Sequence, residues 1–449
     1  MFRVADYIAE FIEKIGVKNV FLLPGGGAMH LVDAVGKNSN LDVVACLHEQ
    51  AAAISAEAYS RISENIGVAM VTTGPGATNA ITAVAGAWIE SVPLIVISGQ
   101  CKRSDMLRNL PLRQNGVQEV DIVKMVKSIT KFSKIVENPD DIRSIMEEAY
   151  YIAKEGRAGP VWIDVPLDVQ GAPVNLNELT AWKGNQNTMP RKHQISSSLM
   201  TDIGELIAKA KRPLILAGHG IRLANSAEPF RAWIEELGVP VVSTWNALDL
   251  LPYSHPLYVG RPGVVALRGP NFAVQNCDLL ISIGCRLDNI ITAYNSKGFA
   301  REAKKVVIDV DLNEIEKLDM PIEISVISDA GDFINEIKEV KLKTSNHLKK
   351  WQKTCNDWKN RYRLNEGKSF PIKGVISHYH LANSLSESVP ENTLISTGSS
   401  GLAVEAFYTV FRNKPGQRVF LTSGLGAMGY GLPSAIGACF ANNKKPMVA

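Results

Sequence analysis

The acidic residue Glu49 opens an alanine-rich stretch, HEQAAAISAEAYSR, that directly follows the apolar run VVAC. A carboxyl group at the end of a strand, beside small apolar side chains, is partly desolvated and can share a proton with a ligand nitrogen. The plainer alternative is that Glu49 only compensates the helix dipole, which contributes at most about 1 kcal/mol. By the same reasoning, His48 is expected to be a structural hydrogen bonder and Glu57 a charge on the helix surface.

Glycine and hydroxyl residues gather in loops that each follow a predicted strand, which is where open α/β sheets bind their ligands. Glycines let the backbone approach a ligand closely, while hydroxyls and free N–H groups suit phosphate. Simple turn chemistry explains any single loop about as well. The loops cover residues 24–27, 72–79, 397–401 and 423–431.

The last of these loops contains GLGAMG, Gly424 to Gly429, which matches the GxGxxG pattern of a dinucleotide-binding turn. The pattern is weak when it stands alone. Gly431 and Pro433 are also unexpected at the start of a Rossmann helix. A Rossmann dehydrogenase therefore remains a minority hypothesis.

Short, β-branched apolar runs alternate with helical patterns along the chain, which predicts parallel strands joined by crossover helices. We expect an α/β fold with three consecutive parallel-sheet domains, the third incomplete. Their predicted bounds are 1–172, 190–340 and 368–449. The polar segment 171–198 is predicted to be a linker, and the basic, tryptophan-bearing stretch 340–364 an amphipathic helix whose charges face solvent.

Individual strands are expected wherever a short apolar run is bounded by turn residues. The predicted strand regions are 17–26, 41–49, 67–76, 92–100, 159–169, 212–220, 239–245, 277–285, 304–311, 391–401 and 417–429.

The composition is that of an ordinary globular protein, with 46% hydrophobic and 21% charged residues and a mean hydropathy of +0.01. A net charge of +3 over 449 residues gives no support to nucleic-acid or membrane binding. The six cysteines show no CxxC spacing, so neither a zinc site nor a disulfide framework is predicted. We expect reduced thiols and a cytoplasmic location. The uncharged stretch between Arg418 and Lys444 predicts a buried glycine-rich turn and helix rather than a membrane span.

Several motifs together resemble one known family: FLLPGGGAMHLVDAV, HEQAAAISAEAYSR, TTGPGATNAITAVAGAW and SGLGAMGYGLPSAIGA. In order and spacing they are similar to the thiamine-diphosphate-dependent 2-keto acid decarboxylases and carboligases, closest to acetolactate synthase catalytic subunits. The resemblance covers essentially the whole chain. It implies decarboxylation of a 2-keto acid, pyruvate favoured, and ligation to a second carbonyl compound. A sister enzyme using another acceptor such as a keto-sugar, a simple decarboxylase and a catalytically silent member remain alternatives.

The resemblance also implies roles for single residues. Glu49 faces the aminopyrimidine of thiamine diphosphate and hydrogen-bonds a ring nitrogen, so that the thiazolium C2 carbon can become a nucleophile. Gln118 lines the active site and Lys131 lies near the substrate. Met428 supports the bent cofactor, and the Gly426 carbonyl accepts a hydrogen bond from its amino group. The remaining expected contacts are Pro24, Gly25, Gly26, Thr73, Gly74 and Asn79 near the pyrimidine, with Gly398, Ser399, Ser400 and Gly424 toward the diphosphate.

The central region is similar to the flavin-contacting part of acetolactate synthases, although Asn289 and Ile290 depart from that pattern. FAD is therefore a predicted cofactor. The residues implied to contact it are Gly284, Arg286, Asp288, Asp309 and Asp329. Two further departures concern specificity: Val117 stands where the family usually has phenylalanine, and GSSG replaces the usual Gly-Gln-His.

The family's Gly-Asp-Gly metal motif would begin about where the sequence stops, so ligands for Mg²⁺ are expected beyond residue 449. Without them the diphosphate charge would be only partly compensated. We therefore expect the 449-residue chain alone to be a truncated, inactive form that binds thiamine diphosphate weakly. The resemblance further implies a homo-oligomer with the active site at the dimer interface, and it allows a regulatory subunit.

Overall fold

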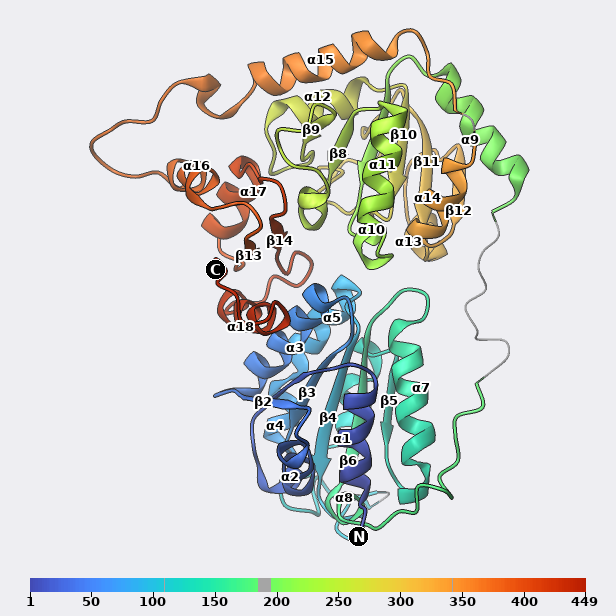
Figure 1. Cartoon of the computed structure of the whole chain (residues 1–449), viewed down its shortest axis with the longest axis vertical. Helices are drawn as coiled ribbons and strands as arrows, with labels where there is room; N and C mark the ends of the chain where they lie inside the picture. Colours follow the sequence, from blue (N-terminus) through green and yellow to red (C-terminus); the bar gives the residue numbers. More distant parts are fainter. Residues whose placement is uncertain (109, 185–194, 341) are drawn as a thin grey trace. The chain divides into compact units, whose positions relative to one another are not determined.

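The computed structural model of the chain describes residues 1–108, 110–184, 195–340 and 342–449, so part of the predicted linker at 171–198 lies outside the described residues. The chain forms two compact units (Figure 1). Unit 1 comprises Met1–Pro190 and Thr422–Ala449, and unit 2 comprises Arg191–Leu421. The third region predicted from sequence, 368–449, is thus divided between the two units.

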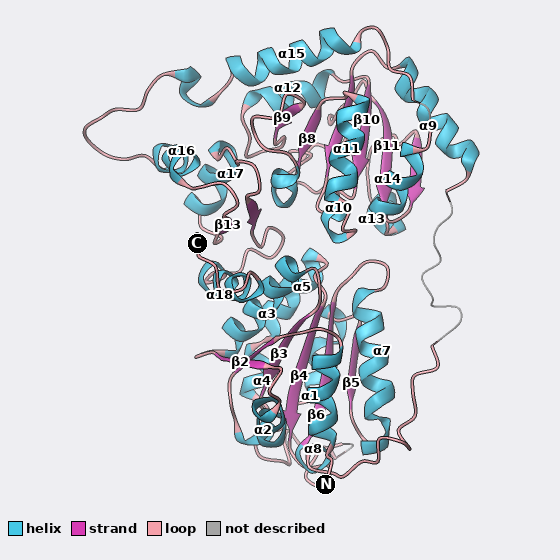
Figure 2. Cartoon of the chain, in the orientation of Figure 1, coloured by secondary structure: helices cyan, strands magenta, loops and turns pink. Residues whose placement is uncertain are grey.

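Unit 1 contains a six-stranded parallel sheet with the strand order β2-β1-β3-β4-β6-β5 (Figure 2). Strands β3, β4 and β6 are buried along their whole length, which explains why their sequences are continuous apolar runs. The strand order changes direction between β1 and β3, so the loops after these two strands flank the crevice where such sheets bind ligands. The strands are β1 Asn19–Leu22, β2 Asp42–Ala45, β3 Gly67–Val71, β4 Leu94–Gln100, β5 Phe132–Ile135 and β6 Pro160–Pro166.

Helix α18 of the C-terminal segment packs along α3 in unit 1. The Ser55 hydroxyl donates to the Pro433 carbonyl at 2.8 Å, and a Cβ on Gly437 would lie 1.9 Å from the Ser55 carbonyl oxygen. This approach confirms that one face of the predicted glycine-rich helix is buried, whereas the prediction that the preceding turn is buried was wrong, since Met428 is 88% exposed. No described helix is long and apolar enough to cross a membrane. The helices of unit 1 are α1 Val4–Lys14, α2 Met29–Lys37, α3 Glu49–Ser63, α4 Pro75–Asn79, α5 Ile81–Glu90, α6 Ile122–Val126, α7 Ile142–Lys154, α8 Leu167–Gln170 and α18 Gly431–Ala441.

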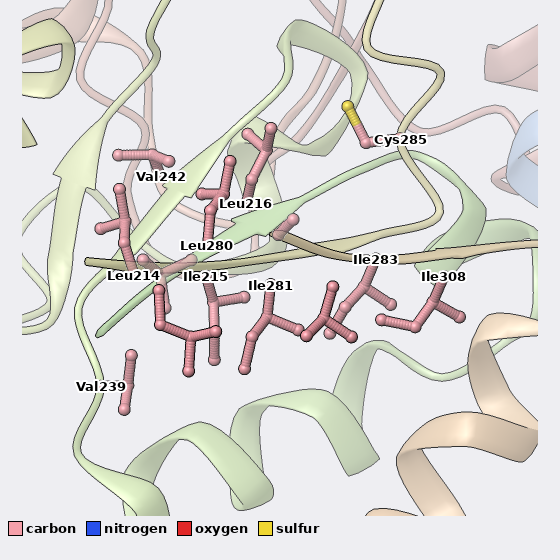
Figure 3. Close-up of a cluster of buried hydrophobic side chains, with 14 of the residues drawn as sticks. Leu214, Ile215, Leu216, Val239, Val242, Leu280, Ile281, Ile283, Cys285 and Ile308 are labelled. Atoms are coloured by element: carbon pink, nitrogen blue, oxygen red, sulfur yellow. The ribbon is translucent and has the colours of Figure 1, made fainter. Parts of the chain in front are cut away.

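Unit 2 contains a second six-stranded parallel sheet, with the order β12-β11-β10-β7-β8-β9. Counted along the chain, this is the doubly wound Rossmann order, and its switch point lies between β7 and β10. Leucine, isoleucine and valine side chains from β7, β8, β10 and β11 fill the core (Figure 3). The strands are β7 Pro213–Ala217, β8 Val241–Ser243, β9 Tyr258–Gly260, β10 Leu279–Ile283, β11 Lys304–Asp309 and β12 Ile324–Ile327; β13 Leu394–Ser396 and β14 Arg418–Phe420 form a separate parallel pair.

The helices of unit 2 cover this sheet and support the β13-β14 pair. The predicted basic helix is confirmed as α15, which buries Leu348, Trp351 and Cys355. The Trp351 indole N–H donates to the Pro213 carbonyl at 2.8 Å and fixes α15 to β7. The helices are α9 Ser197–Lys209, α10 Gly220–Leu223, α11 Ala227–Leu237, α12 Arg268–Asn276, α13 Leu312–Glu316, α14 Ala330–Lys338, α15 Leu348–Arg361, α16 His378–Ser388 and α17 Phe407–Val410.

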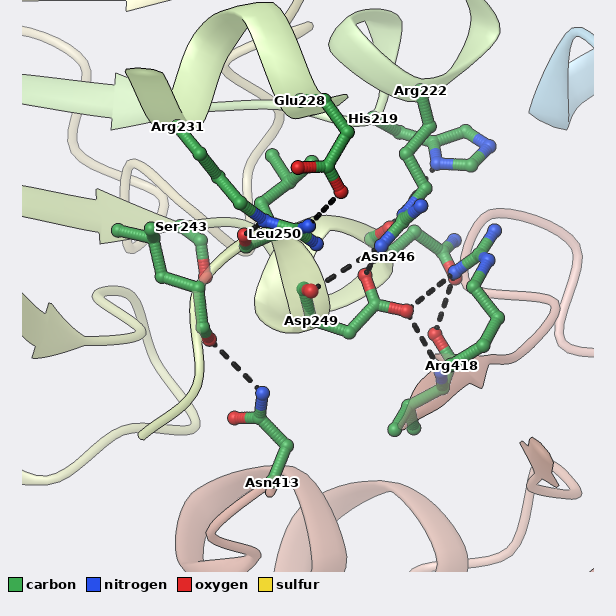
Figure 4. Close-up of polar contacts among 12 residues, drawn as sticks. His219, Arg222, Glu228, Arg231, Ser243, Asn246, Asp249, Leu250, Asn413 and Arg418 are labelled. Atoms are coloured by element: carbon green, nitrogen blue, oxygen red, sulfur yellow. Dashed lines mark hydrogen bonds and ion pairs between the residues drawn. The ribbon is translucent and has the colours of Figure 1, made fainter. Parts of the chain in front are cut away.

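The buried acid Asp249 joins strand β14 to a short helical turn and to helix α10 of unit 2. Asp249 lies in the short helical turn η4, Trp245–Leu250, all of whose residues are buried. Its carboxylate accepts hydrogen bonds from Arg222 at 2.9 Å, from Arg418 at 3.0 Å and from the Val419 N–H at 2.8 Å (Figure 4). Burial alone would raise the pKa of Asp249, but the two guanidinium groups outweigh it and hold that pKa below its ordinary value.

These observations confirm the predicted α/β class with parallel sheets. Every predicted strand region contains a strand. Three strands were not predicted, namely β5, β9 and β12, and each lies at an edge of its sheet. All six cysteines are free thiols in the structure.

Candidate active site

The loops that follow β1 and β3 in unit 1 pack directly on each other. The Gly27 N–H donates to the Thr72 hydroxyl at 3.1 Å. A Cβ on Gly25 would lie 2.4 Å from Thr72 Cβ, and one on Gly27 would lie 1.8 Å from Thr73 Oγ1. Only glycine fits at these positions. Pro24, Gly25, Gly26, Thr73 and Gly74 are thereby brought together at the switch point of the sheet, as predicted.

Glu49 begins helix α3 beside these loops and is only 7% exposed. Its carboxylate accepts a hydrogen bond from the Asn79 side chain at 3.0 Å, and its other oxygen would lie 3.3 Å from a Cβ on Gly76. His48 is the N-cap of α3, where its Nδ1 accepts the Gln50 N–H at 3.1 Å. The structure therefore gives His48 a structural role and leaves Glu49 buried, oriented and next to the glycine loops.

Gln118, in the segment between β4 and α6, also lies beside the glycine loops that follow β1 and β3. Its φ is +61°, and its carbonyl oxygen would lie 2.1 Å from a Cβ on Gly74, which itself has a φ of +60°. Glu119 holds this segment, because its carboxylate accepts the N–H groups of Leu107, Asn115 and Gly116. Val117 is exposed. The structure thus brings Gln118 to the Gly74 loop.

This corner of unit 1 has the features that a thiamine diphosphate pyrimidine needs. Thr73 is 2% exposed, and its hydroxyl makes no hydrogen bond within the described residues. A buried hydroxyl without a partner is costly unless a ligand or water satisfies it. A Cβ on Gly26 would meet nothing within 4 Å, so there is open space beside the loop. Together with the acid Glu49, these features fit the polar ring of the cofactor.

The GLGAMG loop lies in unit 1 and is fixed at both ends by buried carboxylates. Glu90, at the end of α5, accepts the Ser423 hydroxyl at 2.9 Å and the Gly424 N–H at 2.5 Å. Glu57 of α3 accepts the Tyr430 hydroxyl at 2.8 Å. Between these anchors Gly426 adopts a φ of +63°, and the Met428 side chain is 88% exposed. Gly426 and Met428, which are predicted to contact the cofactor, therefore lie in a loop whose two ends are held in place.

The expectation that Glu57 is a surface charge was wrong. Glu57 is 3% exposed and pairs with Arg61, whose Nε lies 2.6 Å from its carboxylate. Arg61 also faces Glu90, with an N–O separation of 3.8 Å. Helix α18 and Tyr430 cover this face of α3, and they lie more than 370 residues away in the sequence. Sequence reasoning missed Glu57 and Glu90 because only the long-range contact shows their role.

Lys131 is not brought together with Glu49 in this chain. Its backbone N–H donates to the Pro160 carbonyl at the amino ends of β5 and β6, whereas Glu49 and the loops lie at the carboxyl edge of the same parallel sheet. The ammonium group of Lys131 donates to the Glu155 carbonyl at 2.5 Å. Burial lowers the pKa of Lys131 to about 8. Its substrate role therefore stays a prediction.

The predicted diphosphate loop belongs to unit 2, where Gly398, Ser399 and Ser400 follow β13. A Cβ on Gly398 would meet nothing within 4 Å. The Ser400 hydroxyl accepts the Ala403 N–H at 3.3 Å at the start of the next helical turn. An open glycine before a helical turn is an arrangement that suits phosphate oxygens.

The residues predicted to contact FAD lie along the carboxyl edge of the large sheet in unit 2. Gly284 follows β10 and accepts the Gly220 N–H at 3.0 Å across the switch point. Asp309 ends β11, and Asp329 caps α14 after β12. Gly284, Asp309 and Asp329 thus lie along one edge of the sheet, next to its switch point, which is where sheets of this order bind dinucleotides.

The side chains at this edge also have protein partners. Asp288 accepts the N–H groups of Ile290 and Ile291 at 3.0 and 3.1 Å. Arg286 faces Glu314 at 3.4 Å. A flavin would therefore have to be recognised largely by the glycine loops and backbone. For metals, the described residues contain no group of three or more His, Cys, Asp or Glu side chains that could hold an ion.

Comparison with known proteins supports the same identification. Family models of the thiamine pyrophosphate enzymes match three segments of the chain. The N-terminal thiamine-pyrophosphate-binding domain matches residues 2–125, the central domain residues 200–337, and the C-terminal thiamine-pyrophosphate-binding domain residues 396–449. These segments include Glu49, Gly284 and Gly398 in turn.

Individual relatives match almost the whole chain. Acetolactate synthase 3, chloroplastic, of Brassica napus is 35% identical over 445 residues, covering 98% of this chain and 66% of the relative. The acetolactate synthase large subunit of Lactococcus lactis subsp. lactis (strain IL1403) is 31% identical, covering 99% and 75%. Acetolactate synthase isozyme 1 large subunit of Escherichia coli (strain K12) is 32% identical, covering 98% and 75%.

The chain thus spans about two thirds of the length of the plant relative and three quarters of the bacterial ones. The matched segments carry the glycine loops, the buried acid and the central Rossmann-ordered sheet described above. The chain therefore belongs to the thiamine-pyrophosphate-dependent enzymes, in the family that includes the acetolactate synthases.

Proposed function

We propose that the protein decarboxylates a 2-keto acid, with pyruvate favoured, and joins the resulting two-carbon unit to a second carbonyl compound. The observation that carries this proposal is the buried Glu49 carboxylate, oriented by Asn79 beside the glycine loops after β1 and β3. The names of the relatives support acetolactate as the product. Other acceptors, including a keto-sugar, and simple decarboxylation are the competing outcomes of the test below.

Thiamine diphosphate, when bound, supplies a carbon nucleophile that attacks a keto-acid carbonyl and stabilises the charge left by loss of CO₂. Glu49 holds a proton at a carboxyl oxygen and shares it with a ring nitrogen of the pyrimidine. The Asn79 amide fixes the orientation of that carboxyl group. The buried Thr73 hydroxyl and the segment of Gln118, whose carbonyl packs on Gly74, border the same corner. Gly398, Ser399 and Ser400 would hold diphosphate oxygens.

The first prediction concerns Glu49. In the full-length gene product, Glu49→Gln removes the acid but keeps the size and the hydrogen bond from Asn79, so activity should fall about 10²–10⁴-fold. Pyruvate depletion and product identity are measured by NMR with purified protein, thiamine diphosphate and Mg²⁺. The matched control is Glu64→Gln, a surface acid just beyond the end of the same helix, which should leave the rate unchanged.

Two results would count against this proposal. Full activity in the Glu49→Gln protein would refute the proton role, and failure of the wild-type protein to consume pyruvate would refute the preferred substrate. A product other than acetolactate, formed from pyruvate and an added sugar or aldehyde, would identify the sister carboligase instead. A protein that consumes no 2-keto acid at all would be the silent family member.

We also propose that FAD binds at the switch point between β7 and β10, supported by the strand order and the position of Gly284, Asp309 and Asp329. The purified protein is then expected to carry a flavin that heat releases and that absorption and fluorescence spectra identify. Protein that carries no flavin, and that leaves the fluorescence of added FAD unchanged, would contradict this.

The remaining proposals follow from family membership. They are three domains with the bounds predicted from sequence, a Mg²⁺ ion bound through the diphosphate, a homo-oligomer with the active site between subunits, a regulatory subunit as partner, and a cytoplasmic location. Light scattering of the purified protein tests the oligomer, since a monomer would exclude a site shared between subunits.

A further inference from the structure

Unit 2 holds a cationic pair, the buried Arg261 and the half-buried Lys359, for which no ion pair with a carboxylate is found among the described residues. Arg261 is 4% exposed, and it donates to the backbone carbonyls of Tyr408 at 2.5 Å and Phe411 at 2.8 Å. Its third nitrogen, Nη1, is buried and makes no hydrogen bond within the described residues. Lys359 of α15 donates to the carbonyls of Tyr253 and Tyr258 at 2.5 and 2.6 Å. Carbonyl oxygens satisfy hydrogen bonds, but they do not neutralise the two charges.

The two cations affect each other. Burial, together with the nearby charge of Arg261, lowers the pKa of Lys359 to about 8. Both side chains line one narrow recess, which also contains Tyr253 and Tyr362. Burying like charges side by side is unfavourable unless an anion compensates them. The solvated-face expectation for helix α15 was therefore wrong for Lys359.

A cavity of about 500 Å³ adjoins this recess and shares Lys359 and Tyr253 with it. Among its described lining residues, four are lysine or arginine and one is acidic. The acid, Glu387, already pairs with Arg412 at 3.2 Å. Lys359, Arg363 and Lys368 therefore line the cavity with no ion pair to a carboxylate of the described residues. The volume falls within the usual range of small-molecule sites, which is about 300–1,000 Å³.

Aromatic groups also border the cavity. The rings of Phe370 and His380 stack with centroids 4.6 Å apart and an angle of 3° between their planes. Tyr253 lies on the other side of Lys359, with the ammonium 4.4 Å from its ring centroid. Cations beside flat aromatic faces suit a ligand that combines phosphate groups with a planar or sugar portion.

The cavity is separate from the predicted diphosphate loop. Apart from the segment 368–370, its lining from the third region comes from helix α16, which precedes β13, and from Val410 and Arg412, which precede β14. These segments lie toward the amino ends of the parallel strands β13 and β14. Gly398 and Ser400 follow the carboxyl end of β13. A ligand in the cavity would therefore approach the strand pair from the opposite edge.

We propose that this cavity is a second ligand site that binds a small molecule bearing a diphosphate group. Lys359, Arg363 and Lys368 contact the phosphate oxygens, and Arg261 supplies further positive charge through the recess it shares with Lys359. The shared chemistry is the diphosphate, which inorganic pyrophosphate and a nucleoside diphosphate both carry. This inference does not depend on the proposed catalytic activity, because it concerns binding alone.

The test is calorimetric titration of the full-length protein with pyrophosphate and, separately, with ADP at low and moderate salt. Arg363→Gln/Lys368→Gln removes two exposed charges of the cavity and should weaken binding at least tenfold. The matched control is Lys349→Gln/Lys350→Gln, which removes two exposed charges from the same helix α15 outside the cavity and should not change the affinity. Binding of both probes identifies the diphosphate as sufficient, and binding of ADP alone shows that the nucleoside also contributes.

A further variant separates this site from the cofactor site. Ser399→Ala/Ser400→Ala alters the predicted diphosphate loop and should leave binding of both probes in the cavity intact, when the titrations are run with thiamine diphosphate in excess to occupy the cofactor site. The proposal is overturned if neither probe binds at millimolar concentration, or if the Arg363→Gln/Lys368→Gln protein binds as well as wild type. It is also overturned if the serine variant, rather than the cavity variant, loses binding. The substituted lysines and arginine are exposed, so folding of the cavity variant and of its control is not at risk.

Discussion

Asp164 of unit 1 and Asp249 of unit 2 are both buried carboxylates, yet their environments shift their pKa values in opposite directions. Asp164 lies in β6, where the Ser98 hydroxyl and the Gln100 amide donate to it at 2.5 and 3.0 Å. Burial raises its pKa to about 7 against those two hydrogen bonds. Asp249 faces two guanidinium groups, and its pKa is lowered instead.

The difference shows that burial alone does not decide the charge of a carboxyl group. A neutral hydroxyl and amide only partly replace the water lost by Asp164, so its protonated form is favoured at mildly acidic pH. Arg222 and Arg418 compensate Asp249 fully and keep it ionised. The first acid is a neutral hydrogen-bonding group within a sheet, and the second is an ionic link between the strand β14 and the turn η4.

The largest expected effect comes from breaking the ionic link. Asp249→Asn removes the buried charge that Asp249 offers to Arg222 and Arg418, and we expect it to cost about 3–5 kcal/mol of stability. Hydrogen exchange measured by mass spectrometry should show lost protection in peptides covering residues 245–251 and 418–421. The matched control is Lys209→Met, which breaks an ion pair whose side chains are 74% and 60% exposed and should cost at most about 0.5 kcal/mol.

The pH dependence of this link has a defined sign. The folded pKa of Asp249 is lowered, so its stabilisation is fully present above the unfolded pKa of about 4 and is lost as the pH falls through the folded value. The difference between wild type and Asp249→Asn should therefore be constant at neutral pH and shrink only in strong acid. A difference that disappears by pH 6 would contradict the ionic assignment.

The Asp164→Asn substitution is expected to change the free energy of unfolding by less, and in the opposite direction. Its folded pKa is raised to about 7, so the stability it provides is fully present below its unfolded pKa and declines as the pH rises through 7. Asp164→Asn keeps the acceptor for Ser98 but cannot ionise. At pH 8 the variant should be more stable than wild type by about 1–3 kcal/mol, and at pH 5 this advantage should be absent.

Urea unfolding followed by circular dichroism at both pH values measures this change. Asp140→Asn, which alters an exposed acid of the same unit, is the control and should show no such pH-dependent gain. If Asp164→Asn differs from wild type by the same amount at pH 5 and pH 8, Asp164 does not titrate between them and its neutral state is refuted.

The sequence could indicate where the glycine loops and the buried acid lie because their signals are local. Glu49, Thr73 and Gly74 each follow an apolar run directly, and parallel strands bring such loops to one edge of a sheet. Two of the three missed strands lack such a local signal. Phe132–Ile135 and Ile324–Ile327 are edge strands with few fully buried positions, so their sequences lack the continuous apolar run that marks a central strand.

Other parts could not be predicted, because they depend on contacts between distant segments. Glu57 and Arg61 show an i,i+4 pattern typical of a solvated helix face, and only Tyr430 reveals that the face is covered. Lys359 belongs to a helix rich in exposed lysines, and nothing local distinguishes it from them. The division of residues 368–449 between the two units is likewise a property of packing and not of composition.

The anchored GLGAMG loop has a consequence for the energetics of binding. A loop that is disordered before its ligand arrives loses conformational entropy on binding, and this weakens the observed affinity. Glu90 and Glu57 already fix this loop at Gly424 and Tyr430, so only the few residues between them retain freedom. Two buried acids that never touch a ligand would in this way raise affinity for one, by having the loop largely ordered in advance.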